Sequence, residues 1–153
     1  MGRLLNFENL KGKLYFGTID NFNEIDAHLY LLCTTHSSDV PDGCILVEQL
    51  APSLDLLYLK KAWLEKNVFS EKFSEFKKLY LAEIESRVDF QKAINVVIDR
   101  IREGKDIVLF DDCNLGKYCH LTILKSYFIE RGFRAETINM NRINNNPLPA
   151  IRW

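Results

Sequence analysis

Two short stretches of the chain gather residue types that carry out chemistry. The first, Cys33 to His36, combines a thiol, two hydroxyls and an imidazole, and the second, Asp111 to His120, holds carboxylates, thiols and another imidazole. Such groups serve as nucleophiles, general acids and general bases. Each stretch comes at the end of an apolar run, so we expect both to lie where buried strands end.

Cys119 has the most reactive environment that the sequence predicts. It stands where a helix is expected to begin, so its thiol faces unpaired backbone N–H groups and the positive end of the helix dipole. This setting, together with a protonated His120, favours the nucleophilic thiolate. We interpret Cys119, His120 and Asp111 as candidate catalytic residues. Two alternatives stay open: the helix start binds a phosphate or carboxylate of a ligand, or Cys119 is a small apolar core residue.

Other polar groups near this thiol are candidate ligand-binding residues. They are Cys33, Thr35, His36, Asp112, Cys113 and Lys117. Lys117 can attract an anion, and the neighbouring carboxylates Asp111 and Asp112 can serve acid–base or magnesium roles. A solvated turn explains the same pair of carboxylates equally well. The ligand that we expect is small and anionic or nucleotide-like.

Metal binding competes for the same residues. Cys113, Cys119 and His120, with Cys33 or His36, offer the donor atoms that tetrahedral zinc prefers. The local spacing, Cys-x5-Cys-His, is not a standard zinc motif, and neighbouring residues on a helix point in different directions. We therefore predict neither a metal nor a cofactor.

The candidate site requires elements that bring the two stretches together. The apolar runs His28–Thr34 and Asp106–Phe110 suit strands that are buried on both faces of a parallel sheet. In open α/β sheets, ligands bind beyond the carboxyl ends of the strands. If these two strands are parallel neighbours, both stretches share one rim with the start of the helix expected over Cys119–Arg131.

The remaining pattern predicts an α/β domain. Ser53, Ser70 and Asp89 are expected to cap three helices in the middle of the chain. The three further strands expected are Lys13–Thr18, Cys44–Glu48 and Phe133–Asn139. We predict a single three-layer domain over residues 1–140, with a mostly parallel sheet of about four or five strands flanked by helices. Residues 141–153 form a C-terminal extension.

Composition excludes several classes of protein. The 153 residues are 47% hydrophobic and 27% charged, which is ordinary for one globular domain and unlike a disordered chain. No apolar run approaches the roughly 20 residues that span a bilayer, and residues 1–8 lack a secretory segment. We therefore predict a cytoplasmic protein without a membrane partner, whose four cysteines are reduced.

The charge pattern bears on nucleic-acid binding. A net charge of −1 argues against a protein that coats nucleic acid by bulk electrostatics. The lysines of the middle helices alternate with glutamates, which is typical of a solvated surface. These lysines are Lys60, Lys61, Lys66, Lys72, Lys77 and Lys78. Arg142, Arg152 and Trp153 of the tail could stack on a base or pack on a partner. A nucleic-acid-processing accessory role is therefore our third hypothesis.

The order of several short motifs resembles the domain-of-unknown-function 488 family. That family has a strand similar to V-x-L-L-C-Y-E, a short loop, and C-H-R at the start of a helix, which Ile107–Leu121 matches in part. Gln49–Ser53 is similar to the family's L-A-P-S segment, and an F-x-x-x-Y-x-x-E-I stretch follows it. The residues that match this second stretch are Phe76, Tyr80, Glu83 and Ile84. Tyr15–Phe16 matches an aromatic pair in the family's first strand.

Departures from the family pattern fall on the candidate site. Cys119 and His120 match the first two residues of C-H-R, whereas Leu121 replaces its arginine. Asp111 takes the place of the family's first cysteine, and Cys113 that of the acidic residue after it. The resemblance, which covers roughly residues 13–139, implies a compact α/β fold in an intracellular, microbial or phage setting.

Two hypotheses on function lead. The first is a small cytoplasmic α/β protein of this type, with an anionic or nucleotide-like ligand at the start of the Cys119 helix and thiol-dependent chemistry. The second is a non-catalytic interaction module, a phage or mobile-element product that has lost the family site. Its 10 Phe and 6 Tyr residues would help form a surface for a protein partner or a homodimer.

Overall fold

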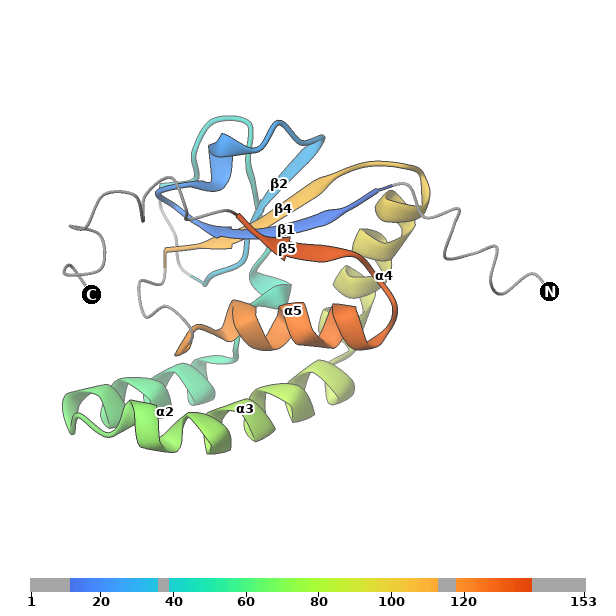
Figure 1. The fold of residues 1–153 in the computed structure, drawn as a ribbon. Coiled ribbons are helices and arrows are strands. Elements are labelled where there is room, and N and C mark those ends of the chain that lie inside the picture. Colours follow the sequence, from blue (N-terminus) through green and yellow to red (C-terminus); the bar gives the residue numbers. More distant parts are fainter. Residues whose placement is uncertain (1–11, 36–38, 113–117, 139–153) are drawn as a thin grey trace.

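The computed structural model describes residues 12–35, 39–112 and 118–138 (Figure 1). It confirms all five expected strands and all four expected helices. The strands are β1 (Leu14–Thr18), β2 (Leu29–Leu32), β3 (Ile45–Leu46), β4 (Ile107–Asp111) and β5 (Ala135–Thr137). The helices are α2 (Leu54–Glu65), α3 (Phe69–Ser86), α4 (Val88–Arg102) and α5 (His120–Glu130), with the short 3-10 helices η1 (Phe22–Glu24) and η2 (Glu48–Leu50).

The five strands form one parallel sheet in the order β3-β2-β4-β1-β5. Strand β2 pairs directly with β4, with Leu32 opposite Phe110, so the predicted parallel neighbours are confirmed. All five residues of β4 are buried. This central strand is continuously apolar up to Asp111 because both of its faces are covered.

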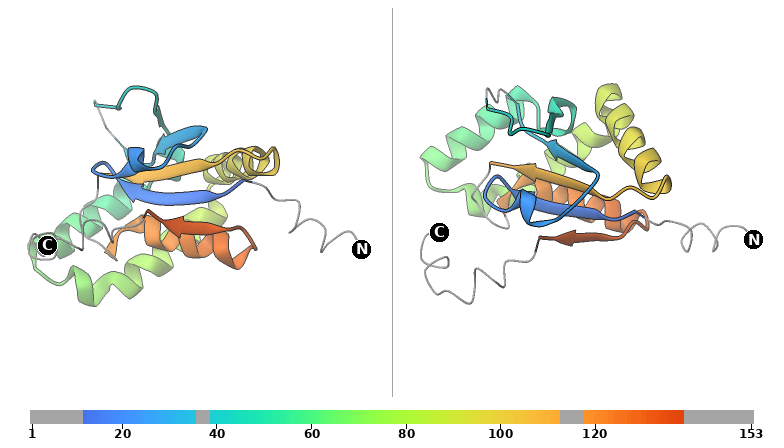
Figure 2. Two further views of the ribbon diagram at one scale, coloured as in Figure 1. Left: turned by 45° about the horizontal axis from the view of Figure 1, so that its top comes forward. Right: turned by 90° about the horizontal axis from the view of Figure 1, so that it is seen from above.

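The layers on the two faces of the sheet differ. All four α-helices pack on the face that carries Leu14, Leu31 and Leu109, and together they enclose the larger core. Within the described residues, the other face, with Val108 and Phe110, is covered by η1 and by connecting segments rather than by α-helices. Figures 1 and 2 show α2, α3 and α5 on one side of the sheet and η1 on the other. The third layer of this α/β domain is therefore thin.

Helix starts agree only partly with the predicted caps. Ser53 caps α2 as expected, since its hydroxyl accepts a hydrogen bond from the Leu56 N–H at 3.2 Å. The caps predicted at Ser70 and Asp89 are wrong. Helix α3 already begins at Phe69, two residues after Asn67 turns the chain with a φ of 63°, and α4 begins at Val88. Asp89 instead accepts from the Phe90 N–H at 2.8 Å within the first turn.

A hydrogen-bonded clamp joins the segment before α2 to the end of α3. The Tyr80 hydroxyl donates to the Leu50 carbonyl at 2.7 Å, and the Ser53 N–H donates to the Glu83 carboxylate at 2.9 Å. Arg87 donates to the Ala51 carbonyl at 2.9 Å. These bonds satisfy backbone groups that would otherwise be buried without partners. They fix the point at which α2 leaves the sheet edge.

No helix in the described part of the chain is both long enough and apolar enough to cross a membrane. The extension predicted over 141–153 lies outside the described residues.

The clamp predicts a measurable cost for losing Ser53. Replacing Ser53 by Ala removes the cap of α2 and the hydroxyl contact with Glu83. We expect the free energy of unfolding to fall by about 1–2 kcal/mol in urea titrations. Ser70→Ala makes the same chemical change at an exposed position inside α3 and should alter stability by less than about 0.5 kcal/mol. Equal effects of the two substitutions would contradict the clamp.

Candidate functional site

Three chain segments meet at the carboxyl ends of β2 and β4. Thr34 and Thr35 follow β2, Asp112 follows β4, and the start of α5 brings His120 to the same rim. The Cys33 N–H donates to the Phe110 carbonyl at 2.8 Å, which extends the pairing of the two strands up to the site. The shared rim that the sequence predicts is therefore confirmed.

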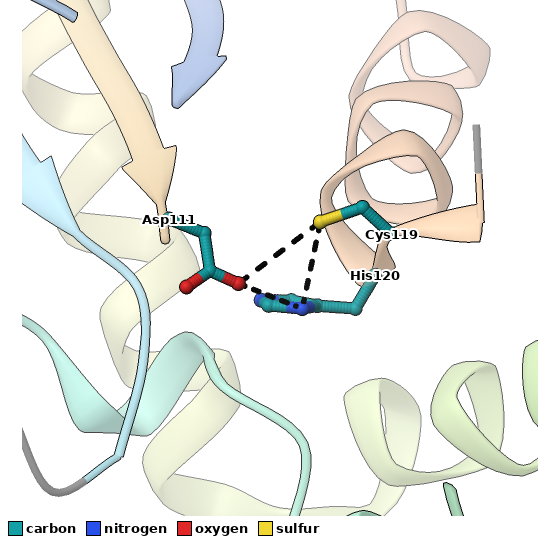
Figure 3. A group of neighbouring side chains, drawn as sticks. All are labelled: Asp111, Cys119 and His120. Atoms are coloured by element: carbon teal, nitrogen blue, oxygen red, sulfur yellow. Dashed lines mark hydrogen bonds and ion pairs between the residues drawn. The ribbon is translucent and has the colours of Figure 1, made fainter. Parts of the chain in front are cut away.

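Asp111, Cys119 and His120 form a compact buried cluster (Figure 3). The Nδ1 atom of His120 lies 3.2 Å from Oδ2 of Asp111. The Sγ atom of Cys119 lies 4.0 Å from each of these two atoms. All three residues are at most 6% exposed. Carboxylate, thiol and imidazole thus converge on one point beneath the rim.

The backbone fixes the orientation of the His120 ring. Its Nε2 atom lies 3.0 Å from the Cys33 carbonyl, which can only accept a hydrogen bond, so Nε2 carries the hydrogen. The ring also packs edge-to-face with the Tyr80 ring, with 5.6 Å between ring centroids and 83° between the ring planes. The lone pair of Nδ1 is therefore directed at Asp111 and Cys119. A hydrogen or a cation must lie between Nδ1 and Oδ2 to make that contact attractive.

Burial keeps the His120 ring uncharged at neutral pH. The loss of solvent, aided by the positive charge of Lys60, lowers the pKa of His120 from 6.5 to about 3. The hydrogen bond to the Cys33 carbonyl and the charge of Asp112 act in the opposite direction but are weaker. A neutral imidazole with Nδ1 unprotonated can accept a proton or bind a metal ion.

A cavity of about 260 Å³ opens beside the cluster. Two members of the cluster, Asp111 and His120, lie on its wall, whereas Cys119 is not among the lining residues. The other lining residues are Thr34, Thr35, Ala51, Pro52, Leu57, Lys60, Leu64 and Asp112. The cavity is thus bounded by α2, by the segment before it, and by the ends of β2 and β4.

The positions of the predicted ligand-binding residues differ. Thr35 and Asp112 line the cavity. The Cys33 side chain is fully buried, and the loss of solvent raises the pKa of its thiol; its contribution to the site is the carbonyl that holds His120. The predictions for His36, Cys113 and Lys117 fall outside the described residues.

Lys60 lines the cavity, although its alternation with glutamates in the sequence predicts a solvated surface. Lys60 is half-buried, and its ammonium group lies 5.6 Å from the centroid of the Phe69 ring. A signal was present in the spacing, because Leu57, Lys60 and Leu64 are three and four residues apart and so share one helix face. Leu57 and Leu64 line the cavity together with Lys60, although Leu64 is itself exposed, so the shared face borders the cavity.

Comparison of the chain with family models, with curated proteins and with solved structures gave no match.

The Tyr80 hydroxyl that supports this site yields a second prediction. Tyr80→Phe keeps the ring against His120 but leaves the buried Leu50 carbonyl without its donor. We expect a loss of about 1–3 kcal/mol in the free energy of unfolding. Tyr58→Phe removes the same hydroxyl from a side chain that is 67% exposed and should have almost no effect. If both variants are equally stable, the Tyr80 hydroxyl does not stabilise this region.

Proposed function

We propose that the cavity binds a small molecule with an anionic group, and that Asp111 and His120 at its wall are the groups that act on it. The observation that carries this proposal is the one cavity, at the carboxyl ends of two parallel strands, that Lys60, Asp111 and His120 all line. This is the location at which α/β sheets bind their ligands.

Lys60 supplies the attraction for an anion. Its charge is one of the causes that lower the pKa of His120, so its positive potential reaches across the cavity. Thr34 and Thr35 also line the cavity, and their hydroxyls can donate hydrogen bonds to phosphate or carboxylate oxygens. A half-buried lysine binds an anion more strongly than an exposed one because solvent screens it less.

The size of the cavity restricts the ligand. Drug-sized ligands occupy pockets of about 300–1,000 Å³, and this cavity has about 260 Å³. A compact phosphate or carboxylate compound fits the space, and a nucleotide would extend beyond it into solvent.

Lys60 and Lys61 offer a matched test of this proposal. The probes are inorganic phosphate and acetate, titrated into isotope-labelled protein and followed by the NMR signals of Thr34, Thr35 and His120. We expect Lys60→Met to weaken binding by about 10- to 100-fold, since hydrogen bonds to charged groups contribute about 1.5–3 kcal/mol. Lys61 is exposed and does not line the cavity, so Lys61→Met should change affinity less than about twofold.

Two results would contradict the proposal. One is the absence of signal changes at these three residues up to the highest anion concentration. The other is an equal loss of binding in both lysine variants, which would indicate general charge attraction rather than a site.

Thiol-dependent chemistry is a second candidate, favoured by the 4.0 Å contact between Cys119 Sγ and His120 Nδ1. In that case Nδ1 takes the thiol proton, and the thiolate at the start of α5 is the nucleophile. Burial acts against this step, because it lowers the pKa of His120 to about 3 and so disfavours the protonated ring. Asp111 acts against it, because its Oδ2 is equally close to the sulfur and a carboxylate repels a thiolate.

Alkylation distinguishes this candidate. If it is correct, iodoacetamide at pH 7, in buffer with a chelator, labels Cys119 faster than a free model thiol and faster than the partly exposed Cys44. Mass spectrometry of the digested protein measures both rates in one sample. A Cys119 rate at or below that of the model thiol would exclude the nucleophile.

The contacts of the clamp support the resemblance to the domain-of-unknown-function 488 family, which we retain as a proposal. The two matched motifs touch each other: Tyr80 donates to Leu50, and Ser53 donates to Glu83. A shared contact gives a physical reason for the two motifs to occur together.

A further inference from the structure

We propose that Asp111, Cys119 and His120 bind a zinc ion through Oδ2, Sγ and Nδ1. This inference goes beyond the proposed function and does not depend on it, because the three donor atoms lie beneath the cavity wall and need no ligand in the cavity. Sequence analysis had predicted no metal, and four features of the tertiary structure lead to the opposite proposal.

The first feature is the size of the donor triangle. The three atoms are separated by 3.2, 4.0 and 4.0 Å. The point in their plane that is equidistant from all three lies about 2.2 Å from each, while zinc bonds are about 2.3 Å to thiolate and 2.0–2.2 Å to imidazole or carboxylate. A zinc ion therefore fits between these atoms with shifts of a few tenths of an ångström.

The second feature is the set of partners behind the donor atoms. His residues that bind metals through one ring nitrogen usually donate the other N–H to a carbonyl or carboxylate. His120 has this arrangement, since Nε2 is held by the Cys33 carbonyl at 3.0 Å and Nδ1 faces the cluster. The Asp111 carboxylate is held in the same way, because its Oδ1 accepts from the Asp112 N–H at 2.6 Å and its Oδ2 faces the cluster.

The third feature is the backbone at the start of α5. Neighbouring residues within a helix point in different directions and so rarely bind one metal ion together. Cys119, however, is not helical. It is the N-cap residue, with extended φ and ψ angles of −96° and 147°, and His120 is the first residue of the helix. The change from extended to helical backbone turns both side chains toward Asp111, as Figure 3 shows.

The fourth feature is the cavity. Three protein ligands leave one position of a tetrahedral zinc ion for water or for a bound molecule. Asp111 and His120 also line the cavity, so we place this position toward it. A zinc ion there would offset the negative charges of Asp111 and Asp112 and would attract the anionic group assigned to Lys60.

The chemistry of the donor set selects the metal. Thiolate and imidazole are ligands of zinc, whereas magnesium and calcium require a shell of oxygen atoms. On binding, a Zn–S bond replaces the S–H bond of Cys119 and the thiol proton passes to solvent. No oxidant or reductant is involved.

Metal binding by the full chain tests the proposal. After removal of metals with a chelator, competition with a chromophoric chelator measures zinc affinity, and cobalt(II) serves as a coloured substitute. We expect one zinc ion per chain and, with cobalt(II), a sulfur-to-metal charge-transfer band that reports a thiolate ligand. Zinc binding without that cobalt band, or no binding at micromolar protein, would overturn the proposal.

Cysteine variants locate the site. We expect Cys119→Ser to weaken zinc binding by more than about 100-fold, the upper end of the cost of losing an outer-sphere partner. Cys44→Ser is the matched control, because Cys44 lies outside the cluster and its Sγ donates to the Asp42 carbonyl at 3.8 Å. Equal zinc affinity in the two variants would overturn the assignment. If Cys119→Ser does not fold, the cobalt spectrum of the unmodified chain decides.

Lys60→Met separates the two proposals. If the zinc site and the anion site are distinct, this variant loses phosphate binding but retains zinc and the cobalt charge-transfer band. Loss of zinc from Lys60→Met would contradict the placement of the metal beneath the wall. Phosphate binding that persists in the metal-free unmodified chain supports the anion site even where the zinc proposal fails.

Discussion

Parallel pairing of β2 with β4 is the constraint on which the rest of the site depends. It brings the ends of two segments almost 80 residues apart to one edge of the sheet, with Leu32 beside Phe110. One further hydrogen bond, from the Cys33 N–H to the Phe110 carbonyl, carries the pairing past the last strand residue. The Cys33 carbonyl is then available to the His120 ring, which ties the start of α5 to the end of β2. A shift of this register by one residue would exchange the faces of β2 and separate these groups.

A second set of contacts positions α2, which lines the cavity next to the carboxyl ends of β2 and β4. The clamp between the segment before α2 and the end of α3 directs α2 across the carboxyl ends of the strands, and α2 carries Lys60 to the cavity. Tyr80 takes part in both structures, since its hydroxyl donates to the Leu50 carbonyl and its ring packs edge-to-face with His120. The aromatic core of α3 is therefore continuous with the site. Because Tyr80 belongs both to the core and to the site, a substitution that removes its ring changes stability as well as the position of His120.

Local patterns in the sequence predicted which helices and strands form, but they did not predict where every helix begins. Alternation and apolar runs located the five strands, and the three- and four-residue spacing of Phe69, Phe73, Phe76, Tyr80 and Ile84 located α3. The N-cap predictions at Ser70 and Asp89 were wrong. These residue types are common at helix starts, but the backbone begins both helices earlier in the chain. Asn67, in the left-handed region, begins the turn that sets the start of α3, so Ser70 lies inside the helix. Ser53 was predicted correctly because its local preference agrees with a tertiary contact to Glu83.

The sequence by itself determined which residues could take part in chemistry and which strand ends would carry them, because residue type and hydrophobic periodicity are local properties. The tertiary structure decided how those groups meet. It placed Lys60 in the cavity wall, it left the Cys33 side chain in the core while using its carbonyl, and it turned Cys119 and His120 toward the same point. Such distances depend on strand register and on the backbone angles of one residue at a helix start, and neither is encoded in the spacing of residues along the chain.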